Sequence, residues 1–217
     1  MENFRSIEVT LRFQKGLYLN RQHNYLAAIA SYDAVLEQEP NYPDAWYNRG
    51  NALYRLGRYE AAIASYDNAI EYEPGFAEAW NNRGSALDDL HRYAEAIASY
   101  DKAIKFKPNY CWAWYNRGIA LRNLERYEEA IDSYDRAIEF KPDYYWAWYN
   151  RALALKQLGK LTNVVASYDK AIEFKPDFEE AWTNRGNALY HLGQLESAIA
   201  SYDKALELRP DNPNTLY

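Results

Sequence analysis

Residue types that support particular chemistries are scarce in this chain. It has one cysteine, Cys111, and three histidines, His23, His91 and His191, in 217 residues. A single cysteine excludes an internal disulfide and fits a reducing compartment. No Cys/His set has metal-ligand spacing, no glycine-rich loop could cradle phosphate, and no Ser/His/Asp arrangement stands out. We therefore expect no catalytic residues, no metal and no cofactor, in a protein that is not an enzyme.

Positive charge and long apolar runs are lacking as well. Lys and Arg number 25 against 31 Asp and Glu, which gives a net charge of −6. This balance argues against non-specific binding to nucleic acid or to an anionic membrane. No apolar run approaches the roughly 18 residues that span a bilayer. The first eight residues lack the apolar core of a secretory signal. We expect a soluble, cytoplasmic protein.

Tryptophan, by contrast, recurs at a fixed interval. Successive members of the main series are 34 residues apart, at Trp46, Trp80, Trp114, Trp148 and Trp182. Prolines follow the same period, at Pro40, Pro74, Pro108, Pro142, Pro176 and Pro210. A constant period of this size indicates stacked repeats that form one array rather than separate globular domains.

The repeat resembles the tetratricopeptide repeat, whose pattern is W-x2-L-G-x2-Y…A-x3-F…P at a period of about 34. The stretch from Ala45 to Leu53, Ala-Trp-Tyr-Asn-Arg-Gly-Asn-Ala-Leu, carries the first part of that pattern. The resemblance implies an all-α fold, a right-handed α-solenoid (superhelix) of antiparallel helix pairs. It also implies that the first helices of the repeats line a concave groove that binds peptides or proteins.

The period divides the chain into segments, which we call repeats 1 to 6. The expected boundaries are an N-terminal helical extension (1–8), a degenerate repeat 1 (9–42), repeats 2 to 6 (43–76, 77–110, 111–144, 145–178 and 179–212), and the start of a truncated further helix (213–217). One long helix is predicted from about residue 3 to 21. In repeat 2, the first helix is predicted from the residue before Trp46 to Leu56, and the second from about Tyr59 to Glu73. Gly57, Gly159 and Gly193 stand where a helix C-cap favours a left-handed residue.

Small residues predict where the two helices of a repeat touch. Gly50 and Ala62 are nearly level across the turn, and the main tryptophan fills the space around them, so we interpret this tryptophan as structural. Repeat 5 has Ala152 and Val164 at the two places. The added volume predicts that its helices lie slightly further apart.

Two charged residues recur on facing helices. Each of repeats 2 to 6 has an arginine three residues after its main tryptophan, where repeat 1 has Lys15, and each second helix carries an aspartate. Antiparallel geometry places Arg83 level with Asp67 of the preceding repeat and with Asp101 of its own. We predict a semi-buried Arg–Asp ladder that sets register. The alternative is an anion site.

An asparagine stands two residues after each main tryptophan, at Asn48, Asn82, Asn116, Asn150 and Asn184. A carboxamide has one acceptor and two donors and can engage a peptide backbone from both sides. The row resembles the asparagine ladder in the tetratricopeptide region of O-linked N-acetylglucosamine transferase. The alternative is that asparagine is simply common at this place in the family.

Repeats 4 and 5 differ from the others on the predicted groove face. Trp112 and Trp146 stand where other repeats have Thr10, Asp44, Glu78 and Glu180. The stripe continues to Tyr115 and Tyr149, and Arg122 and Lys156 lie one turn further along. We predict that this strip is exposed and anchors a peptide. The alternative is that the aromatic side chains pack on each other and on Tyr110 and Tyr144.

The function predicted from these features is that of a protein-interaction scaffold. Adaptors that grip acidic chaperone tails use lysines at defined groove positions, and here those positions hold residues such as Phe13 and Tyr47, so that clamp is not expected. Two alternatives remain open. The chain could be a regulatory or substrate-docking region of a larger enzyme, or it could self-associate through a C-terminal end where Tyr202, Ala205 and Leu206 lack a covering helix.

Overall fold

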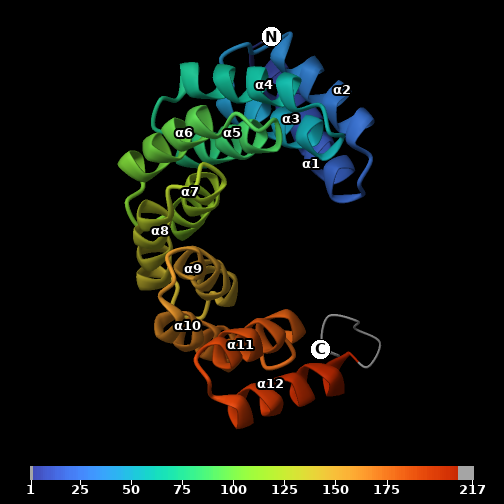
Figure 1. The fold of residues 1–217 in the computed structure, drawn as a ribbon. Coiled ribbons are helices and arrows are strands. Elements are labelled where there is room, and N and C mark those ends of the chain that lie inside the picture. The colour runs from blue at the N-terminus through green and yellow to red at the C-terminus, as the bar shows by residue number, and fades with distance from the viewer. Residues whose placement is uncertain (1, 210–217) are drawn as a thin grey trace. The chain divides into compact units, whose positions relative to one another are not determined.

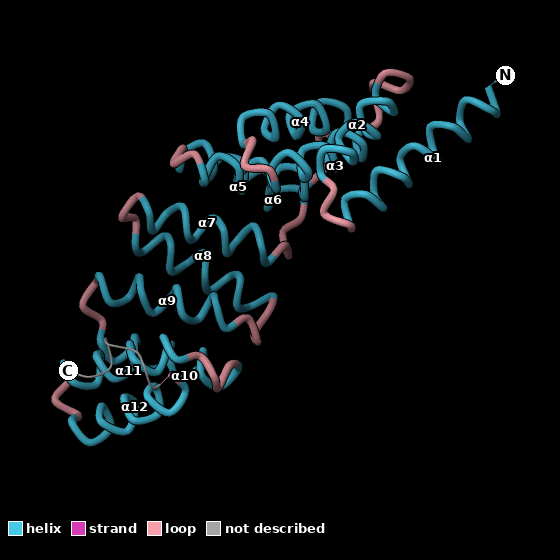
Figure 2. Tube along the Cα trace, turned by 90° about the vertical axis from the view of Figure 1, so that its right-hand side faces the viewer, coloured by secondary structure: helices cyan, strands magenta, loops and turns pink. Residues whose placement is uncertain are grey.

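The structure, a computed structural model, describes the backbone of residues 2–209 and the side chains of residues 7–209. All regular elements in this range are α-helices joined by short turns (Figures 1 and 2). They are α1 (Glu2–Arg21), α2 (Tyr25–Leu36), α3 (Pro43–Arg55), α4 (Tyr59–Tyr72), α5 (Ala77–Asp89), α6 (Tyr93–Phe106), α7 (Cys111–Asn123), α8 (Tyr127–Phe140), α9 (Tyr145–Gln157), α10 (Leu161–Phe174), α11 (Glu179–His191) and α12 (Leu195–Leu208).

The chain forms two compact halves, Met1–Pro108 and Asn109–Tyr217. Each half is built from three helix pairs: α1 to α6 in the N-terminal half, and α7 to α12 in the C-terminal half. Within each half, every helix packs mainly on the helices before and after it in the chain. This sequential packing is typical of a repeat array, in which each repeat contacts only its neighbours.

The observed helix bounds agree with the sequence pattern, with one difference. The predicted long helix is α1, and the second helix of repeat 2 is α4, which ends at Tyr72. The first helix of that repeat, α3, begins at Pro43, two residues earlier than predicted. Proline is compatible with the first turn of a helix, where its missing N–H would have no partner. Because the later repeats begin at the same place, Trp112 and Trp146 lie in the first turns of α7 and α9.

The turn inside each helix pair contains a left-handed residue. Gly57, Gly159 and Gly193 have φ of 71°, 68° and 74°, which confirms the predicted C-caps. The equivalent residues of the other described pairs are not glycine: they are His23, His91 and Glu125, with φ of 58° to 59°. Because residues other than glycine rarely adopt a left-handed backbone conformation, the backbone at these three positions is strained.

A tyrosine ring closes the contact between the two helices of a repeat. A Cβ atom added to Gly50 would lie 2.6 Å from Cε1 of Tyr66, and Gly16, Gly84, Gly118 and Gly186 show the same contact with a tyrosine. In these repeats an aromatic ring, and not Ala62 or its equivalent alone, occupies the space beside the glycine. In repeat 5, Ala152 and Tyr168 occupy the two places, and both are buried.

The main tryptophans join consecutive segments of the chain. The indole Nε1 of Trp46 donates to the carbonyl oxygen of Pro40 at 2.7 Å, and Trp80, Trp148 and Trp182 make the same bond at 2.9 Å. Tryptophan and proline recur with one period because they are partners. These tryptophans are structural, as predicted.

The outer face of α12 differs from the prediction in detail. Ala205 is fully buried, so its expected exposure was wrong, whereas Tyr202 and Leu206 are half-buried. Leu195, Ile199 and Leu208 are the exposed large apolar residues on this helix; Ile199 is 58% exposed, whereas the equivalent Ile97 is 6% exposed. The predicted start of a further helix, 213–217, lies outside the described residues.

Candidate groove-face site

The arginine row is engaged inside the protein. In four pairs the arginine Nε lies 2.6 Å from an aspartate Oδ1 of the preceding repeat: Arg49–Asp33, Arg83–Asp67, Arg151–Asp135 and Arg185–Asp169. The prediction for Arg83 is therefore confirmed, with Asp67 as the partner. Each of these arginines also donates through NH1 to a serine of its own repeat, as Arg83 does to Ser99 at 2.8 Å.

The same guanidinium groups lie over the main tryptophans. The Cζ atom of Arg83 is 5.9 Å from the centroid of the Trp80 ring, and Arg49, Arg151 and Arg185 lie within 6.0 Å of theirs. Each arginine thus has an aspartate, a serine and an aromatic face as partners. This arrangement supports a structural role for the row over the alternative anion site.

The asparagine row also forms contacts between repeats. Asn82 donates through Nδ2 to the Tyr47 hydroxyl at 3.1 Å, and Asn184 does the same to Tyr149 at 3.1 Å. In each case the tyrosine follows the main tryptophan of the preceding repeat. Asn48 instead donates to the carbonyl oxygen of Asp44, in its own helix, at 2.7 Å. The row therefore orients tyrosine hydroxyls.

Asn150 is engaged through both its donor and its acceptor atoms. It is buried, and its Nδ2 donates to the Tyr115 hydroxyl at 3.0 Å and to the Trp146 carbonyl oxygen at 2.9 Å. Its Oδ1 accepts from NH1 of Arg122 at 2.6 Å. The structure thus brings four predicted groove residues into one network. Asn116, in α7, is half-buried.

The aromatic strip combines packing with exposure. Trp112 and Trp146 remain 42% and 39% exposed. Trp112 meets Tyr144 edge-on with ring centroids 4.8 Å apart, and Trp146 meets Phe178 at 4.9 Å. We call these two tryptophans, with Tyr115 and Tyr149, the aromatic strip. Packing on neighbouring rings holds each tryptophan in place, while about two-fifths of its surface faces solvent.

The basic residues near the strip differ in their surroundings. Arg122, in the last turn of α7, is held by Asn150, whereas Lys156, in the last turn of α9, is exposed. Lys141 extends over the strip, with its Nζ 5.0 Å from the centroid of the Trp112 ring. A cation over an indole face is a favourable contact. The strip therefore has positive charge beside it.

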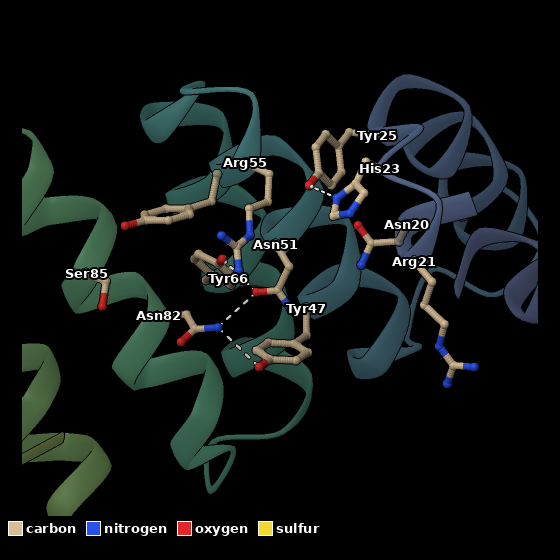
Figure 3. A pocket seen from close by; sticks show the side chains of 11 residues that line it. Asn20, Arg21, His23, Tyr25, Tyr47, Asn51, Arg55, Tyr66, Asn82 and Ser85 are labelled. Carbon is tan, nitrogen blue, oxygen red and sulfur yellow. Dashed lines mark hydrogen bonds between the residues drawn. The ribbon is translucent and has the colours of Figure 1, made fainter. Parts of the chain in front are cut away.

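A pocket in the N-terminal half was not predicted from the sequence. It has a volume of about 550 Å³ and lies on the face of α3, between the C-terminal end of α1 and the middle of α5 (Figure 3). Its lining residues are Asn20, Arg21, His23, Tyr25, Tyr47, Asn51, Tyr54, Arg55, Tyr66, Asn82 and Ser85.

Hydrogen bonds fix the floor of this pocket. Oδ1 of Asn51 accepts from the Tyr66 hydroxyl and from Nδ2 of Asn82, both at 2.9 Å (Figure 3). Burial raises the pKa of the Tyr66 hydroxyl and of the Tyr47 hydroxyl, so both stay protonated and can donate. The floor is therefore a set of oriented amides and hydroxyls.

Sequence comparison identifies the repeat. Models described as tetratricopeptide repeat match residues 13–71 and 49–110, 111–144 and 179–212, and 133–163. A model described as TPR repeat matches residues 154–193. The chain belongs to the tetratricopeptide repeat family. These matches run without a gap from residue 13 to residue 212.

Solved structures with similar folds are also tetratricopeptide arrays or proteins of comparable architecture. YrrB, described as a TPR protein with an unusual peptide-binding site, is 24% identical, with 85% of this chain and 95% of that chain covered and a TM-score of 0.73. MamA is 27% identical, with 74% and 94% covered and a TM-score of 0.71. PilW, a type IV pilus biogenesis factor, is 23% identical, with 95% and 96% covered and a TM-score of 0.80. No curated protein matches the sequence.

Among the residues that the structure describes, no group of three or more His, Cys, Asp or Glu side chains could hold a metal ion. No described helix is both long and apolar enough to cross a membrane.

The pocket was not predicted from the sequence because it is formed by positions whose residues differ between repeats. Arg21 and Arg55 are 34 residues apart and so occupy the same place in successive tetratricopeptide repeats, but the next repeat has Asp89 there. A search for features shared by all repeats passes over such a pair. Comparison of neighbouring repeats at each groove position would have found it.

Proposed function

We propose that the protein is a non-enzymatic interaction scaffold that binds an extended segment of a partner protein on the faces of its first helices. The observation that carries this proposal is the aromatic strip. Two large tryptophan side chains, at equivalent places of neighbouring repeats, keep about two-fifths of their surface in solvent. Tryptophan and tyrosine dominate the binding energy of protein interfaces.

The geometry of the strip suits an extended ligand. Neighbouring helices in such packing lie roughly 8–10 Å apart, and an extended peptide advances about 3.3 Å per residue. Trp112 and Trp146 would therefore receive side chains about three residues apart in the peptide. Their partly packed rings lose little freedom on binding, which favours affinity.

The asparagine row contributes by orienting hydroxyl groups. In the C-terminal half, the Tyr149 oxygen accepts a hydrogen bond from Asn184, which leaves the tyrosine O–H hydrogen as a donor. Donors of this kind can meet the carbonyl groups of a bound peptide. The role that we propose in peptide binding for Asn48, Asn82, Asn116, Asn150 and Asn184 is thus to support the groove residues that contact the peptide backbone.

The comparison with YrrB agrees with this proposal, since that protein is described as having a peptide-binding site. Family membership favours a protein partner over a small molecule, because tetratricopeptide arrays present extended surfaces rather than closed active sites.

A peptide array tests the proposal. The double variant Trp112→Ala/Trp146→Ala is expected to lower the affinity for each captured peptide by about 30-fold or more, which corresponds to about 2 kcal/mol of binding free energy. The matched control is Phe174→Ala, an aromatic residue of similar exposure on the second helix α10. Affinity that is unchanged in the double variant would remove the aromatic strip as the binding site.

A further inference from the structure

Two arginines in the N-terminal half differ from most others in the protein. The arginines at the 49, 83, 151 and 185 positions each pair with an aspartate, and Arg92 and Arg126 each pair with a glutamate. Arg21 and Arg55 form no ion pair with any side chain among residues 7–209. Both line the pocket on α3. The chain has a net charge of −6. Two arginines without carboxylate partners therefore make this pocket a locally positive site on a negatively charged protein.

The residues that line the pocket around these two arginines carry no negative charge. No aspartate or glutamate is among its lining residues. In Figure 3 the Arg55 side chain extends toward Tyr66 and Asn51, while Arg21 lies at the opposite edge. The nearby carboxylate of Asp89 accepts from the Tyr54 hydroxyl at 2.5 Å, so this residue already has a donor of its own.

We propose that this pocket binds a carboxylate of an acidic peptide, with Arg55 as the principal counter-ion and Arg21 at the rim. This inference rests on the proposed function and specifies the chemistry of one ligand position. A guanidinium group binds a carboxylate through two parallel N–H donors, which a neutral amide cannot match. The carboxylate is that of an Asp or Glu side chain or that of a peptide C-terminus.

The site differs from the clamp considered in the sequence analysis. That clamp places lysines at groove positions that here hold Tyr47 and Phe13. Arg21 and Arg55 lie instead in the last turns of α1 and α3, beside the turn that carries His23. The proposed carboxylate would therefore lie near the ends of the first helices.

The experiment uses the full chain and an array of acetylated octapeptides with C-terminal amides. One set has Glu fixed at the fourth position and its partner set has Gln there. The Glu peptides are expected to bind about tenfold more tightly than their Gln counterparts. Arg55→Gln is expected to abolish this preference, and Arg21→Gln to reduce it. Arg58→Gln, which changes an exposed arginine outside the pocket, is expected to retain it.

A third set, with Gln at the fourth position and a free C-terminal acid, separates the two sources of carboxylate. If the Glu amides bind more tightly than the Gln amides, the pocket reads a side chain; if only the Gln free acids do, the pocket reads a chain terminus. A carboxylate preference that survives both Arg21→Gln and Arg55→Gln would overturn the inference. Peptides that bind equally well in all three sets, and lose affinity in the aromatic-strip variant, would overturn it while leaving the proposed function in place. An array that captures no peptide would contradict both.

Discussion

The Nε atom of Arg83 lies 2.6 Å from Oδ1 of Asp67, one tetratricopeptide repeat earlier, while NH1 of the same arginine donates to Ser99. One side chain thus joins three helices, α4, α5 and α6. Because the distances recur in other repeats, this arginine fixes how far each helix pair slides along its neighbour.

The two partners of this bridge should contribute unequally to stability. Asp67→Asn is expected to lower the free energy of unfolding by only about 0.2–1 kcal/mol, because half of the aspartate side chain is exposed. Arg83→Ala is expected to cost about 1–3 kcal/mol, since it also removes the Ser99 hydrogen bond and the packing on Trp80. Urea unfolding of both variants measures the difference. Equal costs would show that the ion pair alone carries the effect.

The strained turn of repeat 4 offers a stabilising change. Glu125 has φ of 59°, whereas the equivalent residue of repeat 5 is Gly159. We expect Glu125→Gly to raise the free energy of unfolding by about 0.5–1 kcal/mol, because glycine adopts this conformation without strain. The control, Lys102→Gly, places glycine inside α6 and should cost up to about 1 kcal/mol. A loss of stability in Glu125→Gly would contradict the strain argument.

Two buried tyrosines test how much a hydrogen bond of the hydroxyl group contributes to the stability of the protein. The Tyr66 hydroxyl donates to Asn51, whereas the Tyr168 hydroxyl has no partner among the described residues. Tyr66→Phe is expected to destabilise the protein by about 1 kcal/mol. Tyr168→Phe should be neutral or stabilising, because it removes an unsatisfied buried group. Thermal unfolding of the two variants gives the comparison, and a clear loss in Tyr168→Phe would refute it.

The isoleucines at one repeated position test the packing between helix pairs. Ile97→Ala should cost about 2–5 kcal/mol, because the side chain is buried. Ile199→Ala should change stability by less than about 0.5 kcal/mol, because Ile199 is exposed. If Ile199→Ala were as costly as Ile97→Ala in dilute solution, the α12 face would have to be covered, for instance by a second copy; light scattering would then detect the larger species.

The sequence predicted the fold well because every helix pair repeats one set of local rules. Apolar spacing, the Trp–Pro period and the Arg–Asp geometry are each set by residues 34 apart, and the Arg83–Asp67 contact follows from level antiparallel helices. The exact partners were harder to predict. The ring of Tyr66 over Gly50 depends on side-chain direction as well as on the spacing of Cα atoms along the helices.

The candidate site was only partly predictable for a related reason. The aromatic strip stood out because Trp112 and Trp146 replace charged residues. The pocket on α3 did not stand out in the sequence. It is lined by residues from several helices, and residues such as Asn20 and Ser85 are ordinary on their own. The engagement of Asn150 by Tyr115 and Arg122 likewise depends on where long side chains end in space.

The most direct test of the central claim follows the indole N–H signals of the seven tryptophans by NMR while a peptide selected on the array is added. The account predicts that the signals of Trp112 and Trp146 shift as the peptide saturates the protein. It also predicts that the signals of Trp46, Trp80, Trp148 and Trp182, whose Nε1 atoms donate to proline carbonyls, stay in place. A saturated complex in which the Trp112 and Trp146 signals do not move would contradict the claim that the aromatic strip binds the partner.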